Sequence, residues 1–134
     1  MEYSKILNLE SIGNDEDGFL VPIDKIDIKF DIKRIFYLYN VPQYSSRGAH
    51  AYYNTEQILI CLAGSLKVKC FNGDEENIYE LRSPKKALYI PANIWRETLD
   101  HSSNAVLLVM SSKEYDRKDY IKDYNEFLRV VKCI

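Results

Sequence analysis

The chain has 134 residues, of which 46% are hydrophobic and 28% are charged, and its formal net charge at neutral pH is -2. This length allows one domain, residues 1–134, and the composition is typical of a folded globular protein rather than a disordered one. The slight negative charge provides no bulk attraction to nucleic acid or anionic lipid, so neither is an expected partner.

The cysteine content and the apolar runs limit the possible locations of the protein. Three cysteines at positions 61, 70 and 133 include no Cys-x-x-Cys pair, so neither a disulfide framework nor a thiolate zinc site is expected. No apolar run approaches the roughly 18 residues that span a bilayer, and residues 1–7 lack the apolar core of a secretion signal. We therefore expect no membrane partner and a cytoplasmic location.

Short strands separated by turns dominate the predicted secondary structure. A hairpin signal, Asn72-Gly73, joins two of them, and turns recur roughly every 8–12 residues. This spacing predicts an all-β antiparallel barrel or jelly roll. In chain order we expect a strand at 3–9, a turn or loop at 11–18 and alternating apolar and polar residues at 26–32. Further strands are expected at 34–39, 56–62, 65–71, 77–81, 87–90, 95–100 and 105–111.

The tail over residues 114–131 changes character. Tyr120, Tyr124, Phe127 and Leu128 recur at helical spacing. We therefore predict one short amphipathic helix in this segment, after the last strand.

Two sequence patterns resemble the metal-binding motifs of cupin-type barrels. Those motifs read His-x-His followed by a glutamate and a glycine, and then Pro-x-Gly-x-x-His. Most of the spacing survives here, but most of the ligands do not. The first set of positions holds His50, Tyr52, Glu56 and Gly64, and the second holds Pro91, Asn93 and Arg96.

Arg96 in the place of a metal ligand argues against a metal. A guanidinium group has no lone pair to offer and repels a cation. The same group suits an oxyanion, an enediolate or a phosphate. We therefore expect no metal and no other cofactor, and a site built on the single imidazole of His50.

The runs RGAHAYYNTEQILICLAGSLKV and SPKKALYIPANIWRETLDHSSNAVLLVMSSKEYDRKDYIKDYNEF resemble the sugar-nucleotide 3,4-ketoisomerases, and the likeness also covers the early segment DIKRIFY. The central block and the Tyr-Ile-x-Asp-Tyr tail are its most specific parts. This resemblance implies a cupin jelly roll that forms a homodimer with exchanged N-terminal strands. It implies that the substrate is a thymidine-diphosphate-linked (TDP-linked) 4-keto-6-deoxyhexose, whose ketone moves from C4 to C3. The product would feed synthesis of 3-amino-3,6-dideoxy sugars for glycan coats such as lipopolysaccharide.

The resemblance also implies roles for individual residues. His50 matches the catalytic base, and Tyr52 stands where the family has a second histidine. Arg96 resembles the type of member that forms the gluco product. Arg47 would contact the diphosphate, and Gln57 and Tyr37 would line the cleft.

The chemistry itself supports these roles. Moving the ketone requires removal of the C3 proton, an enediol and protonation at C4, and histidine titrates in the range that suits both transfers. Arg96, Tyr37 and Tyr52 would supply donors to the enediolate. A diphosphate attracts arginines, and Arg34 and Arg82 are available besides Arg47.

Other interpretations remain open from sequence. Arg34 and Arg82 are as readily explained as surface ion pairs, and Glu56 as a brace for His50 or Arg47. His101 lies in a predicted turn and is expected in solvent. Competing functions are a sugar-nucleotide epimerase, a non-catalytic nucleotide-sugar-binding module and, more remotely, a metal-dependent cupin oxygenase.

Overall fold

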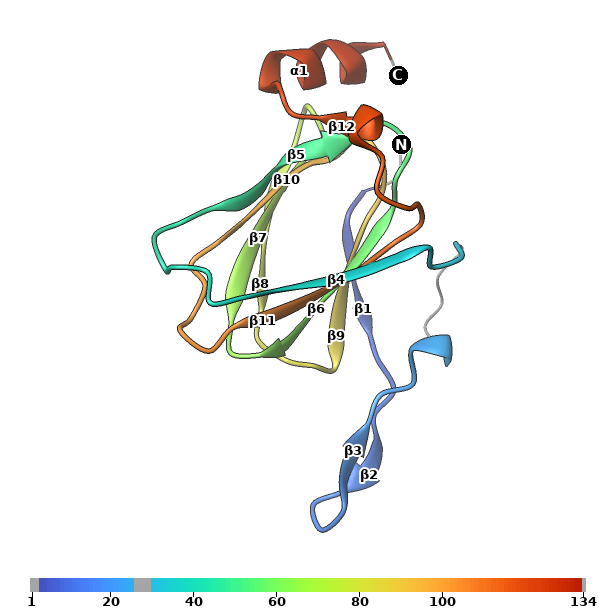
Figure 1. Ribbon diagram of the computed structural model, residues 1–134, viewed down its shortest axis with the longest axis vertical. Coiled ribbons are helices and arrows are strands. Elements are labelled where there is room, and N and C mark those ends of the chain that lie inside the picture. Colours follow the sequence, from blue (N-terminus) through green and yellow to red (C-terminus); the bar gives the residue numbers. More distant parts are fainter. Residues whose placement is uncertain (1–2, 26–29, 134) are drawn as a thin grey trace.

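The computed structural model describes residues 3–25 and 30–133, without the side chains of Lys25 and Gly48. Two five-stranded antiparallel sheets face each other, with helix α1 over one end of the barrel and a long hairpin projecting from the other (Figure 1). The predicted antiparallel jelly roll with a short C-terminal helix is confirmed.

Each sheet is built from strands that lie far apart in sequence. The first has the order β1 (Lys5–Asn8), β9 (Lys86–Ile90), β6 (Gln57–Ala63), β11 (Val106–Ser111) and β4 (Arg34–Tyr39). The second has the order β12 (Tyr120–Ile121), β5 (Arg47–Tyr52), β10 (Trp95–Leu99), β7 (Leu66–Phe71) and β8 (Glu76–Leu81).

The main core fills the space between the two sheets. Strand β7 alternates as predicted, because its residues Leu66, Val68 and Cys70 are buried while the lysines between them are partly exposed. Across from them, Leu59 and Leu107 of the first sheet belong to the same apolar cluster. Burial of each such side chain stabilises the fold by roughly 1.5–3 kcal/mol. Because side chains alternate along a strand, each strand therefore turns its apolar face toward the core.

Strand β6 is buried on both faces. Its alternate residues Ile58 and Ile60 pack in a second cluster against residues of the N-terminal segment, including Leu7 and Leu9. This segment therefore covers part of the outer face of the first sheet. Because β6 is covered on both faces, its sequence is a continuous apolar run, whereas a strand with one face in solvent would alternate apolar and polar residues.

The turn or loop expected over residues 11–18 is confined to residues 15–17, and strands flank it on both sides. Strands β2 (Ile12–Asn14) and β3 (Gly18–Leu20) pair as a hairpin that extends away from the barrel (Figure 1). A Cβ on Gly13 would lie 2.0 Å from the carbonyl oxygen of Gly18, so only glycine permits this close pairing. In the alternating segment 26–32, residues 26–29 lie outside the described residues.

The predicted C-terminal helix is shorter than expected. A 3-10 helix (Arg117–Asp119) and strand β12 precede α1 (Tyr124–Lys132), so Tyr120 lies on a strand and not on a helix. Asp116 caps the 3-10 helix and Asp123 caps α1, each by accepting a hydrogen bond from a backbone N–H. The two caps start two separate helices where the sequence suggested one. Within the described part of the chain, no helix is long and apolar enough to cross a bilayer.

Candidate active site

A cavity of about 290 Å³ lies between the two sheets. One part of its wall is apolar and comes from the first sheet, and the other is polar and comes mainly from the second. The apolar lining residues are Phe36, Leu38, Leu59, Leu107 and Val109, and the polar ones are Arg34, Arg47, His50, Tyr52, Gln57, Arg96, Thr98 and Tyr120.

His50 presents an unused nitrogen at this cavity. Among the described residues, its Nε2 is a buried side-chain atom without a hydrogen-bond partner. Burial, together with the positive charges of Arg96, Lys122 and Arg34, lowers the pKa of His50 from 6.5 to about 3. The imidazole is therefore neutral near neutral pH, and its pKa in the empty cavity lies below the near-neutral range expected from the sequence.

Arg96 lies opposite His50 on the neighbouring strand β10. Its side chain is almost fully buried and donates from Nη1 to Oε1 of Gln57 (2.7 Å) and from Nε to the carbonyl oxygen of Ile94 (3.1 Å). Asn93, in the turn before the strand, has a φ of 62°, which is why this position suits glycine or asparagine. The turn is held by a hydrogen bond from the Asn93 amide to the carbonyl oxygen of Tyr52 (2.8 Å).

Two tyrosines lie beside His50. The ring centroid of His50 is 4.8 Å from that of Tyr52 and 4.9 Å from that of Tyr120. Nη1 of Arg34 donates to the hydroxyl of Tyr120 (3.1 Å), and Nε2 of Gln57 donates to the hydroxyl of Tyr52 (3.2 Å). The imidazole is thus surrounded by hydroxyl and guanidinium donors.

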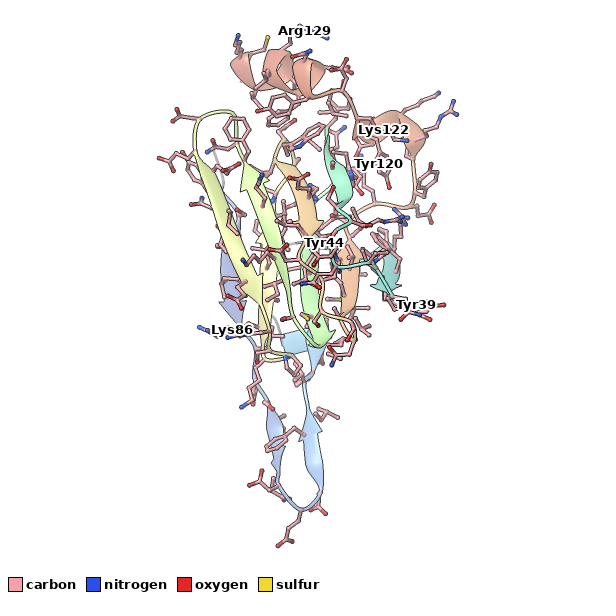
Figure 2. All side chains as sticks on the ribbon, turned by 90° about the vertical axis from the view of Figure 1, so that its left-hand side faces the viewer. Tyr39, Tyr44, Lys86, Tyr120, Lys122 and Arg129 are labelled. Carbon is pink, nitrogen blue, oxygen red and sulfur yellow. The ribbon has the colours of Figure 1, made fainter. Side chains whose placement is uncertain are left out.

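The chain segment that brings Tyr120 to the cavity is tied to the barrel by a buried carboxylate. Asp119 accepts hydrogen bonds from the backbone and side-chain amides of Asn54 (both 3.0 Å) and from the hydroxyl of Thr55. Figure 2 shows Tyr120 and Lys122 close together beneath the helix that carries Arg129. Strand β12 pairs with β5 next to Tyr52, and this places Tyr120 in the wall.

The structure brings together six of the eight predicted site residues: Arg34, Arg47, His50, Tyr52, Gln57 and Arg96. Tyr37 is not among them, because it lies on the outer face of β4 with 62% of its surface exposed. Tyr39, on the same face, points away from the barrel in Figure 2. Since side chains alternate along a strand, Phe36 faces the cavity in its place.

Arg82 is also absent from the cavity. It follows β8 at the far edge of the second sheet, and its side chain is 71% exposed and contacts Glu80 at 3.0 Å. The surface ion pair that was the alternative interpretation of Arg82 is therefore the observed one. Arg34, for which the same alternative was open, instead lines the cavity.

Two further expectations are wrong. His101 is buried rather than solvated, and its Nε2 hydrogen-bonds with the hydroxyl of Thr98, which lines the cavity (2.9 Å). Glu56 accepts a hydrogen bond from the hydroxyl of Tyr89 (2.5 Å) and braces neither His50 nor Arg47. Sequence reasoning gave Tyr120 no role at the site, although Tyr120 begins the Tyr-Ile-x-Asp-Tyr tail that the family resemblance covers, because its helical spacing suggested a packing residue of a helix.

The residues at this site do not fit a divalent cation. A cation at the centre of the cavity would meet the buried guanidinium of Arg96, and one imidazole is the sole nitrogen ligand contributed by the lining. Within the described residues, no three His, Cys, Asp or Glu side chains gather where they could hold a metal ion.

The comparisons with known proteins agree with this fold and identify the family. Residues 2–132 match the family described as WxcM-like, C-terminal (FdtA), and the chain belongs to this family. A TDP-4-oxo-6-deoxy-alpha-D-glucose-3,4-oxoisomerase from Aneurinibacillus thermoaerophilus is 36% identical over 129 residues, which are 96% of this chain and 92% of the relative.

The similar solved structures are also sugar 3,4-ketoisomerases. QdtA, a sugar 3,4-ketoisomerase from Thermoanaerobacterium thermosaccharolyticum in complex with TDP, is 41% identical with a TM-score of 0.92, over 97% of this chain and 95% of its own. A variant of QdtA with asparagine in place of a histidine was crystallised with TDP-4-keto-6-deoxyglucose. WlaRB, a TDP-quinovose 3,4-ketoisomerase from Campylobacter jejuni, is 40% identical with a TM-score of 0.89, over 96% and 99% of the chains.

Proposed function

We propose that this protein is an isomerase that moves the ketone of TDP-4-keto-6-deoxyglucose from C4 to C3 through an enediol. The observation that carries the proposal is the unpartnered Nε2 of His50, held neutral in a cavity surrounded by cationic donors. The substrates and ligands of the similar ketoisomerases identify the sugar nucleotide.

His50 is the base in this reaction. Its Nε2 takes the proton from C3, the electron pair of that bond forms a C3–C4 double bond, and the C4 carbonyl oxygen takes a proton from a hydroxyl group of the site, that of Tyr52 or of a water molecule. The imidazolium then returns a proton to C4, while the C3 hydroxyl gives its proton back to that group and becomes the new ketone. One histidine therefore serves both transfers, and no net proton is consumed.

The arginines divide the remaining work. Arg96 on β10 is the cross-strand neighbour of His50 on β5. Its buried guanidinium stabilises the negative charge that develops on the sugar oxygens, because a fixed cation in a site shielded from water is most effective there. Arg34 and Arg47 bind the diphosphate at the cavity wall. Since the enediolate is stabilised by these groups, the reaction requires no metal.

The product of this reaction is TDP-3-keto-6-deoxyglucose, with the gluco configuration at C4. Arg96 and the similarity to a TDP-quinovose ketoisomerase support this configuration. A 3-keto sugar is a substrate for amination, so the product feeds synthesis of 3-amino-3,6-dideoxy sugars in the cytoplasm for glycan coats such as lipopolysaccharide.

The working unit is a homodimer in which N-terminal strands are exchanged. The β2–β3 hairpin extends from the barrel and leaves Phe19 59% and Leu20 60% exposed. The outer face of β4 exposes Ile35 and Tyr37, each by 62%. Two such unpartnered apolar surfaces on one chain support association with a second copy. Light scattering on the protein and on a Phe19→Ser/Leu20→Ser variant tests this, since the variant is expected to be monomeric.

A solvent-exchange experiment tests the catalytic proposal. The protein is incubated in D2O with TDP-4-keto-6-deoxyglucose, and the products are followed by NMR. We expect the 3-keto isomer, with deuterium at C4 in every turnover in which the His50 imidazolium exchanges with solvent before it returns its proton. Exchange at C5 would indicate an epimerase instead, and tight binding without conversion or exchange would indicate a non-catalytic binding module.

A further inference from the structure

A β-bulge in β5 brings Arg47 and His50 to the same wall of the cavity. His50 pairs with Arg96 of β10 and Arg47 pairs with Thr98, so two residues of β5 lie opposite one residue of β10. In a regular strand, residues three positions apart point to opposite faces of the sheet. The extra residue of the bulge reverses this relation, and both side chains line the cavity. The bulge therefore allows one strand to supply both the base and a cation.

Thr98 is bonded to β5 at this bulge. Its hydroxyl donates to the carbonyl oxygen of Arg47 (3.4 Å). Because a carbonyl oxygen only accepts, the single proton of the hydroxyl is used in this bond. The hydroxyl oxygen is then the acceptor for its second partner, Nε2 of His101, which lies 2.9 Å away. The shorter bond from His101 thus orients the hydroxyl toward the longer bond to Arg47.

His101 supplies the proton of the shorter bond as a neutral ring. Only 2% of its surface is exposed. Burial lowers the pKa of His101, and the positive charge of Arg47 lowers it further, against the opposite effect of Asp100. A neutral imidazole carries one N–H, and this one is directed to Thr98. The three groups therefore form one directed chain from His101 to the backbone of Arg47.

The turn that carries His101 is fixed to a neighbouring turn of the barrel. Asp100 has a φ of 52°, a left-handed conformation that turns the chain after β10. The amide of Ser102 donates to the carbonyl oxygen of Ser65 (2.8 Å), and the amide of Ser65 donates to the hydroxyl of Ser102 (2.9 Å). A Cβ on Gly64 would lie 2.3 Å from this hydroxyl, so glycine permits the close approach. His101 is therefore a fixed support for Thr98.

The Arg47 end of β5 depends on this support. Strand β12 pairs with β5 at the other end, at Ala51 and Tyr52. Residues 40–46, which lead into β5, lie in neither a helix nor a strand, and Arg47 itself is exposed. The pairing with β10 and the bond to Thr98 thus hold the strand where Arg47 enters the wall.

We infer that His101 and Thr98 are positioning residues that hold the β-bulge and thereby direct Arg47 to the diphosphate. This inference rests on the part of the proposed function in which Arg47 binds the diphosphate. His50 is held separately, by its pairing with Arg96 and by β12 beyond it. The pair therefore acts on the binding of the nucleotide and not on the proton transfer at the sugar.

Calorimetry with TDP and steady-state kinetics on a matched pair of variants test the inference. A glutamine amide reaches as far from the backbone as Nε2 of histidine, whereas an asparagine amide reaches only as far as Nδ1. His101→Asn should raise both the Kd for TDP and the KM by about fivefold to fiftyfold and leave kcat within about threefold of wild type. His101→Gln should recover most of the affinity. Ser103→Ala, exposed in the same turn, is the control and should bind TDP like the wild type.

Thr98→Val provides a second test that does not alter the buried ring. It removes the hydroxyl and keeps the shape of the side chain, so it should weaken TDP binding by a factor similar to that of His101→Asn. The inference is therefore tested even where His101→Asn does not fold.

The double variant Arg47→Ala/His101→Asn shows whether His101 acts through Arg47. If it does, the double variant should bind TDP no more weakly than Arg47→Ala alone. Multiplied losses would overturn the inference, as would a Kd within about twofold of wild type in both His101→Asn and Thr98→Val, or equal losses in His101→Asn and His101→Gln. A wild-type protein that binds TDP without converting the sugar would refute the proposed isomerase and leave this inference standing. A wild type that does not bind TDP would refute both.

Discussion

The partly buried His50 makes the stability of the protein sensitive to acid. Its pKa is 6.5 in an unfolded chain and about 3 in the folded protein, mainly because burial disfavours the charged ring. A histidine with a lowered folded pKa binds protons more readily when unfolded. Acid therefore favours unfolding, and the loss of stability begins as pH falls below about 6.5 and is complete near pH 3.

Replacing His50 by glutamine removes this effect. Each pH unit between the two pKa values costs 1.36 kcal/mol, so at about pH 5 the wild type is destabilised by about 2 kcal/mol through this group, against a few tenths at about pH 7. Between about pH 7 and about pH 5, the free energy of unfolding of His50→Gln should thus fall by about 2 kcal/mol less than that of the wild type. This difference does not depend on the stability of the variant at pH 7.

Urea unfolding followed by tryptophan fluorescence at several pH values measures this difference. The other titrating groups are shared by both proteins, so they cancel when the two profiles are subtracted. Tyr44→Phe, at a position 97% exposed, controls for the effect of substitution itself and should run parallel to the wild type. Parallel profiles for His50→Gln and wild type would refute a neutral His50 with a lowered pKa.

Three further outcomes are expected. The same His50→Gln variant should lose about 10²–10⁴ in kcat while its TDP affinity by calorimetry stays near that of wild type; a near-normal rate would contradict His50 as the base. Arg82→Ala should leave KM unchanged, because the side chain lies outside the cavity; a large rise in KM would show that Arg82 reaches the substrate. Asp119→Asn should lower the free energy of unfolding by about 1–3 kcal/mol, since one oxygen that accepts from Asn54 or Thr55 becomes a donor; an unchanged Tm would contradict this.

Local patterns were sufficient for most of the fold. The alternation of Leu66, Val68 and Cys70 and the Asn72-Gly73 turn predict the β7–β8 hairpin, because strand periodicity and turn chemistry are local properties. The spacing of the motifs that contain His50 and Arg96 likewise predicted two residues that the structure places opposite each other.

The errors arose where distant contacts decide the structure. The side of β4 that faces inward depends on the opposite sheet, so the sequence alone did not distinguish Phe36 from Tyr37. The pairing of Tyr120 with Tyr52 connects residues far apart in the chain and has no local signal. His101 occupies turn-like sequence, yet its partner Thr98 lies at the cavity and keeps it buried.

The assembly of the cavity from distant strands also has a consequence for folding. Strand β5 joins β10 and β12, which follow it by dozens of residues, and long loops must close before these contacts form. Chains with many such contacts fold slowly. Tyr120 enters the wall only when the C-terminal segment docks through Asp119. Refolding chains should therefore regain their β-sheet signal before their enzymatic activity, so the rate of recovered turnover reports the final step of folding.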